Sequence, residues 1–232
     1  MSLIVYSKMF DEIEKSLVPY GVSIHDYKNA QEAAGFTYTT NTGECLPTPF
    51  FFESNPFRSE MLSSKNVLEI GCGVGRNLSM IMEHTDAHYW GVDPNLKMTQ
   101  YFWEVQDPKW KSRVTIVSDF KELPTDLSID TVIVTFVFQH IGFRPPYGQM
   151  HVVDITKAAM QYTHNDTVWF VYEHEREERW QERWLSELNI VPEYYFKAGG
   201  NHDGGGTLPS IEFATMAHRG NDNNLIMFKE HK

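Results

Sequence analysis

The sequence has little cysteine, no cluster of basic residues and no long apolar run. Only Cys45 and Cys72 occur among its 232 residues, far apart in the chain. A disulfide framework is therefore not expected, and a reducing compartment such as the cytoplasm is favoured. No apolar stretch approaches the roughly 20 residues that a membrane-spanning helix needs. Lys8, Asp11 and Glu12 closely follow a brief apolar start, which does not resemble a signal peptide.

Negative charge predominates over the whole chain. The sequence has 31 Asp and Glu residues against 20 Lys and Arg residues, a formal net charge of −11. Such a field repels phosphate backbones, so we expect no nucleic-acid partner. Hydrophobic residues at 41% and charged residues at 22% are ordinary for a soluble globular protein, and without a long apolar run we expect no membrane partner.

The most informative stretch is a short apolar run followed by alternating glycines. The run at 67–70 is typical of a strand that is buried on both faces. Apolar residues then recur at helical spacing within 76–84, which predicts a helix. Strand, tight turn and helix place free main-chain N–H groups at the turn, where a ligand can approach closely. The glycines of this turn are Gly71, Gly73 and Gly75.

The spacing of these glycines distinguishes two classes of ligand. The dinucleotide fingerprint requires a third glycine at its sixth position, but Arg76 stands there. A large cation would obstruct the close helix–strand packing which that glycine allows. Glu69 precedes the turn and gives the pattern E-x-G-x-G-x-G. This pattern resembles the first motif of class I S-adenosylmethionine-dependent methyltransferases.

The resemblance extends downstream and covers about residues 64–175. Asp93 ends a second apolar run and looks like the acid of this family that binds ribose. Asp119 follows a third run and looks like the acid that binds adenine, with the main-chain N–H of Phe120 facing a ring nitrogen. Ordinary capping of a turn or helix is the alternative for both acids. The donor-binding residues that the resemblance implies are Glu69, Gly71, Gly73, Gly75, Asn77, Asp93, Asp119, Phe120 and Phe136.

Two groups of titratable residues follow the fourth and fifth predicted strands. His140 is the candidate general base, since imidazole has a pKa near neutrality; the alternative is that it only packs beside the donor. Glu173 and His174 at the end of the fifth strand could join residues 201–203 in a metal site. Neighbouring residues on a strand point in opposite directions, so we expect a solvated polar rim and no metal.

The order of elements predicts an α/β fold, a doubly wound and mostly parallel seven-stranded sheet with an antiparallel last strand. We expect a mostly helical N-terminal cap at 1–63 and a Rossmann-like methyltransferase domain at 64–232. The phenylalanines at 50–52 could cover an apolar acceptor, but packing of the cap onto the core is favoured. Strands are expected at 66–70, 88–92, 113–117, 131–136, 166–172 and 190–197, with the closing strand at 213–218 or 224–228, and helices at 76–84, 95–105, 150–162 and 175–188.

The resemblance implies methyl transfer from S-adenosylmethionine to an oxygen or nitrogen nucleophile of a small or medium-sized acceptor. Two alternatives stay open. One is an enzyme of the same fold that carries out aminopropyl transfer or donor cleavage. The other is a catalytically silent, donor-binding partner subunit. The sequence predicts neither the acceptor nor the oligomeric state.

Overall fold

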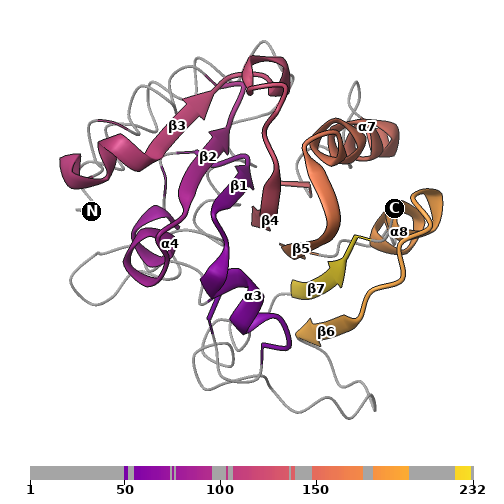
Figure 1. The fold of residues 1–232 in the computed structure, drawn as a ribbon. Coiled ribbons are helices and arrows are strands. Elements are labelled where there is room, and N and C mark those ends of the chain that lie inside the picture. The colour runs from indigo at the N-terminus through magenta and orange to yellow at the C-terminus, as the bar shows by residue number, and fades with distance from the viewer. Residues whose placement is uncertain are drawn as a thin grey trace, which may run out of the picture.

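The computed structural model places the chain around a single mixed sheet (Figure 1). Of the expected N-terminal cap, residues 1–63, only the last part is described, and it includes helix α3 (Arg58–Ser63). The structure describes residues 50–51, 55–73, 75, 77–95, 103, 107–135, 137–138, 148–174, 180–198 and 223–230.

The sheet has seven strands in the order β3-β2-β1-β4-β5-β7-β6 within the described ranges. Strands β1 to β5 pair in parallel, while β7 runs antiparallel to both β5 and β6. The predicted α/β fold with its antiparallel last strand is therefore confirmed, and the later of the two candidate runs forms that strand. The strands are β1 (Asn66–Ile70), β2 (His88–Val92), β3 (Val114–Val117), β4 (Ile129–Thr135), β5 (Thr163–His174), β6 (Tyr194–Ala198) and β7 (Asn223–Lys229).

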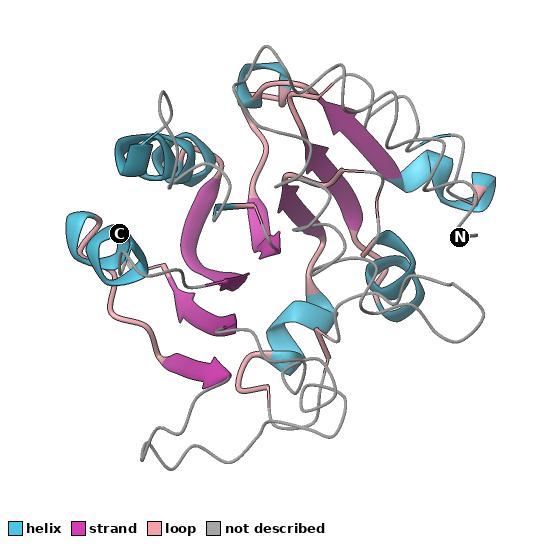
Figure 2. Ribbon diagram, turned by 180° about the vertical axis from the view of Figure 1, so that it is seen from behind, coloured by secondary structure: helices cyan, strands magenta, loops and turns pink. Residues whose placement is uncertain are grey.

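Helices cover both faces of this sheet, as the view from behind also shows (Figure 2). Side chains of α3 and α4 pack into one apolar core, and those of α7 and α8 pack into the other. None of the described helices is long and apolar enough to cross a membrane. Apart from Trp103, the helix expected at 95–105 lies outside the described residues from position 96 onward. The remaining helices are α4 (Leu78–His84), α7 (Gly148–Met160) and α8 (Trp180–Glu187), with 3₁₀ helices η3 (Pro108–Arg113) and η4 (Phe120–Glu122).

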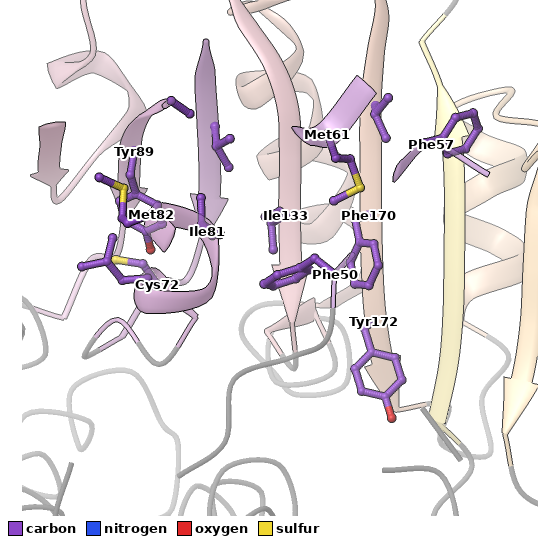
Figure 3. Close-up of a cluster of buried hydrophobic side chains, with 14 of the residues drawn as sticks. Phe50, Phe57, Met61, Cys72, Ile81, Met82, Tyr89, Ile133, Phe170 and Tyr172 are labelled. Atoms are coloured by element: carbon purple, nitrogen blue, oxygen red, sulfur yellow. The ribbon is translucent and has the colours of Figure 1, made fainter. Parts of the chain in front are cut away.

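Strand β5 contributes to both cores because its side chains alternate between the two faces. Phe170 faces the α3 and α4 side, where it meets Phe50 with ring centroids 5.0 Å apart. Figure 3 shows this contact beside Met61 of α3. Phe50 is fully buried, so this aromatic residue of the expected cap packs onto the core, as the sequence favoured.

Trp184 of α8 holds the other core together. It is 2% exposed and contacts Phe138 and Phe228 edge-on, at centroid distances of 5.6 and 6.2 Å. Its indole N–H donates to Thr156 Oγ1 of α7 at 3.0 Å. One side chain thus joins α7, α8, β7 and the chain that follows β4.

Replacing Trp184 with alanine is expected to lower the free energy of unfolding by about 3–5 kcal/mol, because the surrounding elements cannot close the cavity that the indole leaves. Trp103, 41% exposed, is the control; its replacement with alanine is expected to cost less than about 1 kcal/mol. Denaturant unfolding followed by circular dichroism measures both. Equal losses in the two variants would contradict the assigned role.

Candidate active site

The glycine turn lies at the carboxyl end of β1 and is left-handed at every glycine. The φ angles are +67° at Gly71, +53° at Gly73 and +75° at Gly75. Residues with a Cβ rarely adopt this conformation, which explains the alternating glycines of the sequence. The turn is anchored at its start by the Gly71 N–H, which donates to the carbonyl of Val92 on β2 at 2.7 Å.

The turn also packs against the chain that leaves β4. A Cβ placed on Gly71 would lie 2.3 Å from Cγ2 of Val137, so no larger residue fits. The Val137 side chain thus lies directly against the main chain of Gly71. This contact brings the end of β4 next to the candidate donor site.

A buried carboxylate lies at the end of β1, just before the turn. Glu69 is 2% exposed, and its Oε1 accepts a hydrogen bond from Asn77 Nδ2 at 2.7 Å. The phenolic O–H of Tyr89 donates to the other oxygen, Oε2. Asn77 Nδ2 also donates to Thr135 Oγ1 at 3.0 Å. The network connects β1, β2, β4 and the start of α4, and so it fixes the turn from the interior.

Two further buried groups adjoin this network. Burial, reinforced by the negative charge of Glu69, raises the pKa of Tyr89 well above its usual value, so the phenol stays protonated and donates. Burial and the carboxylate of Asp93 raise the pKa of Cys72 in the same way. A thiol with a raised pKa is a poor nucleophile. Cys72 is 4% exposed and therefore acts as a small packing residue.

Asp93 stands at the end of β2 and reaches back to the turn. Its Oδ2 accepts a hydrogen bond from the Gly73 N–H at 2.9 Å, and its Oδ1 accepts one from the Asn95 N–H at 2.8 Å. The residue is 8% exposed, and burial raises its pKa from 3.8 to about 6. Each carboxylate oxygen has two lone pairs, so each can accept one more donor. Two vicinal ribose hydroxyls match that capacity.

Asp119 and Phe120 follow β3 at the same edge of the sheet. Asp119 is exposed, and its Oδ1 accepts a hydrogen bond from the Lys121 N–H at 2.9 Å, which caps η4. This contact is the one expected if Asp119 is a capping acid, the alternative that the sequence left open. Because β1, β2 and β3 are parallel neighbours, the glycine turn, Asp93 and Asp119 all lie along one edge, in the order that the resemblance implies.

The remaining predicted residues differ in how the structure places them. Phe136 and His140 lie outside the described residues. Asn77 is 1% exposed and its amide nitrogen is directed at Glu69 and Thr135, so the structure shows it supporting the turn. No group of three or more His, Cys, Asp or Glu side chains close enough to hold a metal occurs in the described part of the chain.

One residue has a role that sequence reasoning missed. Glu173 is fully buried at the end of β5, and its Oε1 accepts hydrogen bonds from the N–H groups of Val137 and Phe138 at 2.7 and 3.0 Å. From the sequence we expected Glu173 to lie in a solvated polar rim, and this expectation is wrong. An acid at the end of an otherwise apolar strand was the available signal, but its partners are 35 and 36 residues away in the chain.

Comparison with known proteins agrees with this arrangement. Residues 68–150 match the family model described as a methyltransferase domain. No curated protein matches the sequence at a significant level. The fold is similar to that of the plantazolicin methyltransferase BpumL (TM-score 0.54, 12% identity, covering 99% of this chain and 100% of that one). It is also similar to that of the N-methyltransferase NodS from Bradyrhizobium japonicum WM9 (TM-score 0.51, 13% identity, 78% and 90% covered).

A third structure with a similar fold is the geranyl diphosphate C-methyltransferase from Streptomyces coelicolor A3(2), with a TM-score of 0.52, 9% identity and 77% and 78% of the chains covered. All three were solved with S-adenosylhomocysteine. The matched domain contains the glycine turn, Asp93 and Asp119. Residues 68–150 thus match a methyltransferase domain in sequence, and the chain shares its fold with methyltransferases that were solved with S-adenosylhomocysteine.

Asp93 is expected to make donor affinity depend on pH. Protonation below about pH 6 removes a charge-assisted acceptor, so affinity for S-adenosylhomocysteine should fall as the pH drops from 8 to 5, by about tenfold. In Asp93→Asn the affinity should be weaker at pH 8 and flat across this range. Isothermal titration calorimetry measures both profiles. A flat wild-type profile would contradict the role of Asp93.

Asp119 and Asp107 form a matched pair for testing the adenine contact. Both are exposed, and each caps a 3₁₀ helix through Oδ1 and the N–H two residues later, at 2.9 Å. Only Asp119 follows a strand of the donor edge. Alanine at either position should lower stability slightly and similarly, but only Asp119→Ala should weaken S-adenosylhomocysteine binding, by about tenfold. Equal affinities in the two variants would show that Asp119 is a cap alone.

Proposed function

We propose that the chain transfers the methyl group of S-adenosylmethionine to an oxygen or nitrogen nucleophile of a small or medium-sized acceptor. The observation that carries this proposal is the arrangement at the carboxyl edge of the sheet. The glycine turn and Asp93 end neighbouring strands, and the chain leaving β4 packs over Gly71. In the sequence that chain continues to His140 within three residues of Val137.

The chemistry is an in-line displacement at a methyl carbon. A bond forms between the acceptor atom and the methyl carbon while the carbon–sulfur bond breaks, and S-adenosylhomocysteine leaves with the electron pair. Glu69 fixes the turn, and Asp93 accepts the ribose hydroxyls, so the donor is held in one orientation. A neutral oxygen or nitrogen nucleophile loses a proton in this step. His140 accepts that proton in our proposal, since imidazole does so near neutral pH.

The relatives of this fold do not agree on the atom that is methylated, since NodS is an N-methyltransferase and the Streptomyces enzyme a C-methyltransferase. Our preference for oxygen or nitrogen rests on His140 as proton acceptor. The net charge of −11 opposes a nucleic-acid acceptor. The proposal places the enzyme in the cytoplasm, in keeping with its two widely separated cysteines.

Incubation of the protein with methyl-labelled donor and a panel of phenols, hydroxy acids and amines tests the proposal. Label should move to an acceptor while an equal amount of S-adenosylhomocysteine is released. Release of methylthioadenosine would instead indicate aminopropyl transfer or donor cleavage. Donor binding without any product would indicate a silent, donor-binding subunit.

His140→Ala is expected to lower turnover about a hundredfold or more on the panel compound that the wild type methylates, with donor affinity retained. His164→Ala is the control, because His164 lies at the start of β5, at the far edge of the sheet, with Nε2 at 3.2 Å from Asp130 Oδ1. It should retain turnover within about twofold. Turnover of His140→Ala at the control level would remove the proposed base.

A further inference from the structure

The carboxylate of Glu173 stands where the β4–β5 ladder ends. The last pair of this parallel ladder joins Thr135 to Tyr172. Beyond it, Oε1 of Glu173 accepts hydrogen bonds from two consecutive main-chain N–H groups, those of Val137 and Phe138. The Glu173 side chain thus connects β5 to the chain that follows β4, beyond the last main-chain hydrogen bonds between the two strands. Because Glu173 is fully buried, its loss would leave the buried N–H of Phe138 and the partly buried N–H of Val137 without this acceptor.

The N–H that Glu173 holds belongs to the residue that packs on the glycine turn. The methyl groups of Val137 occupy the space where a Cβ of Gly71 would stand, at 2.3 and 2.7 Å from that position. A small shift of the main chain at 137 would therefore press on Gly71 or open a gap beside it. The turn has no side chain at Gly71 that could absorb the change.

The neighbouring residue is held as well. Phe138 is fully buried and packs edge-on against Trp184 at 5.6 Å. On the other side of Glu173, the antiparallel register places Asn224 of β7 directly opposite, and Gln181 of α8 accepts a hydrogen bond from the amide of Asn224. All of these side chains are buried. These neighbours hold the side chain of Glu173 in place. Its hydrogen bond to the Val137 N–H can therefore fix the main chain at residue 137.

From this geometry we propose that Glu173 is a positioning residue of the donor site, which acts through Val137 on the glycine turn. Glu173 itself faces the core that contains Trp184 and contacts main chain. Glu173 fixes the position of the Val137 side chain beside Gly71. The position of Val137 in turn determines the space that is left for the amino-acid end of the donor. The inference rests on the proposed use of the turn to hold the donor, but not on the acceptor or on His140.

The test uses the affinity for S-adenosylhomocysteine, measured by isothermal titration calorimetry on the full chain. Glu173→Ala should weaken binding about tenfold. Glu173→Gln keeps an oxygen that accepts both N–H groups, so it should bind within about threefold of the wild type. The matched control is Glu230→Ala, since Glu230 is also a buried acid, accepts from Thr163 and from Trp169 Nε1, and lies at the opposite edge of the sheet. The control should lose stability but keep its affinity within about twofold.

A double-mutant cycle tests whether the effect passes through residue 137. Val137→Ala keeps the main-chain hydrogen bonds but removes the methyl groups that face Gly71, so it should weaken binding by about three- to tenfold. The double variant Glu173→Ala/Val137→Ala should be no worse than about twofold below the weaker single variant, because both changes disturb the same contact. Losses that multiply independently would overturn the proposal.

Three results separate the possible failures. A wild type that does not bind S-adenosylhomocysteine would contradict the donor site itself. A wild type that binds and a folded Glu173→Ala that binds equally well would overturn only the positioning role. If Glu173→Ala does not fold, Glu173→Asp decides, because its carboxylate is one methylene shorter and cannot hold both N–H groups in their places. It should bind S-adenosylhomocysteine at least about threefold more weakly than the wild type, and unchanged affinity in a folded Glu173→Asp would overturn the proposal.

Discussion

The position of the donor turn depends on the buried carboxylate of Glu69. A buried charge is costly unless hydrogen-bond donors reach it, and Asn77 and Tyr89 supply one to each oxygen. These partners come from the start of α4 and from β2, so satisfying the carboxylate fixes both relative to β1. The end of β1 is thereby fixed, and the turn with its left-handed glycines begins at that point.

Two other acids hold the same turn from its two sides, each by accepting main-chain N–H groups. Asp93, on the β2 side, accepts from Gly73 within the turn. Glu173, on the β5 side, accepts from Val137, whose side chain packs on Gly71. At its three glycines this turn has no side chain that could fix the backbone. The carboxylate of Asp93 constrains the turn directly, through the Gly73 N–H, and in our proposal Glu173 constrains it through Val137.

Local patterns predicted the parts of the fold whose signals are local. β1 and β2 were predicted at their observed bounds, since apolar runs end in glycines or an acid there. β5 begins at Thr163, three residues before the predicted start, because Ile129 already pairs with Thr163. The ladder then shifts register, and Asp166, with φ of +74°, lies in the irregular part. No periodicity reveals such an irregularity. Glu173 was misread for a similar reason, since its partners lie 35 and 36 residues away.

Asp93 opposes the stability of the fold at neutral pH, as expected of a residue kept for binding. Its pKa rises from the ordinary value of 3.8 to about 6 because burial disfavours the charge, a difference that corresponds to about 3 kcal/mol. Between these pH values the folded chain takes up the proton before the unfolded chain does, so this residue alone makes the fold more stable as the pH falls. At neutral pH the ionised carboxylate therefore opposes folding. A neutral side chain would avoid that cost but would offer donor hydroxyls a weaker acceptor. The N–H groups of Gly73 and Asn95 offset part of the cost, and in the proposed site the ribose hydroxyls of the donor would supply further partners.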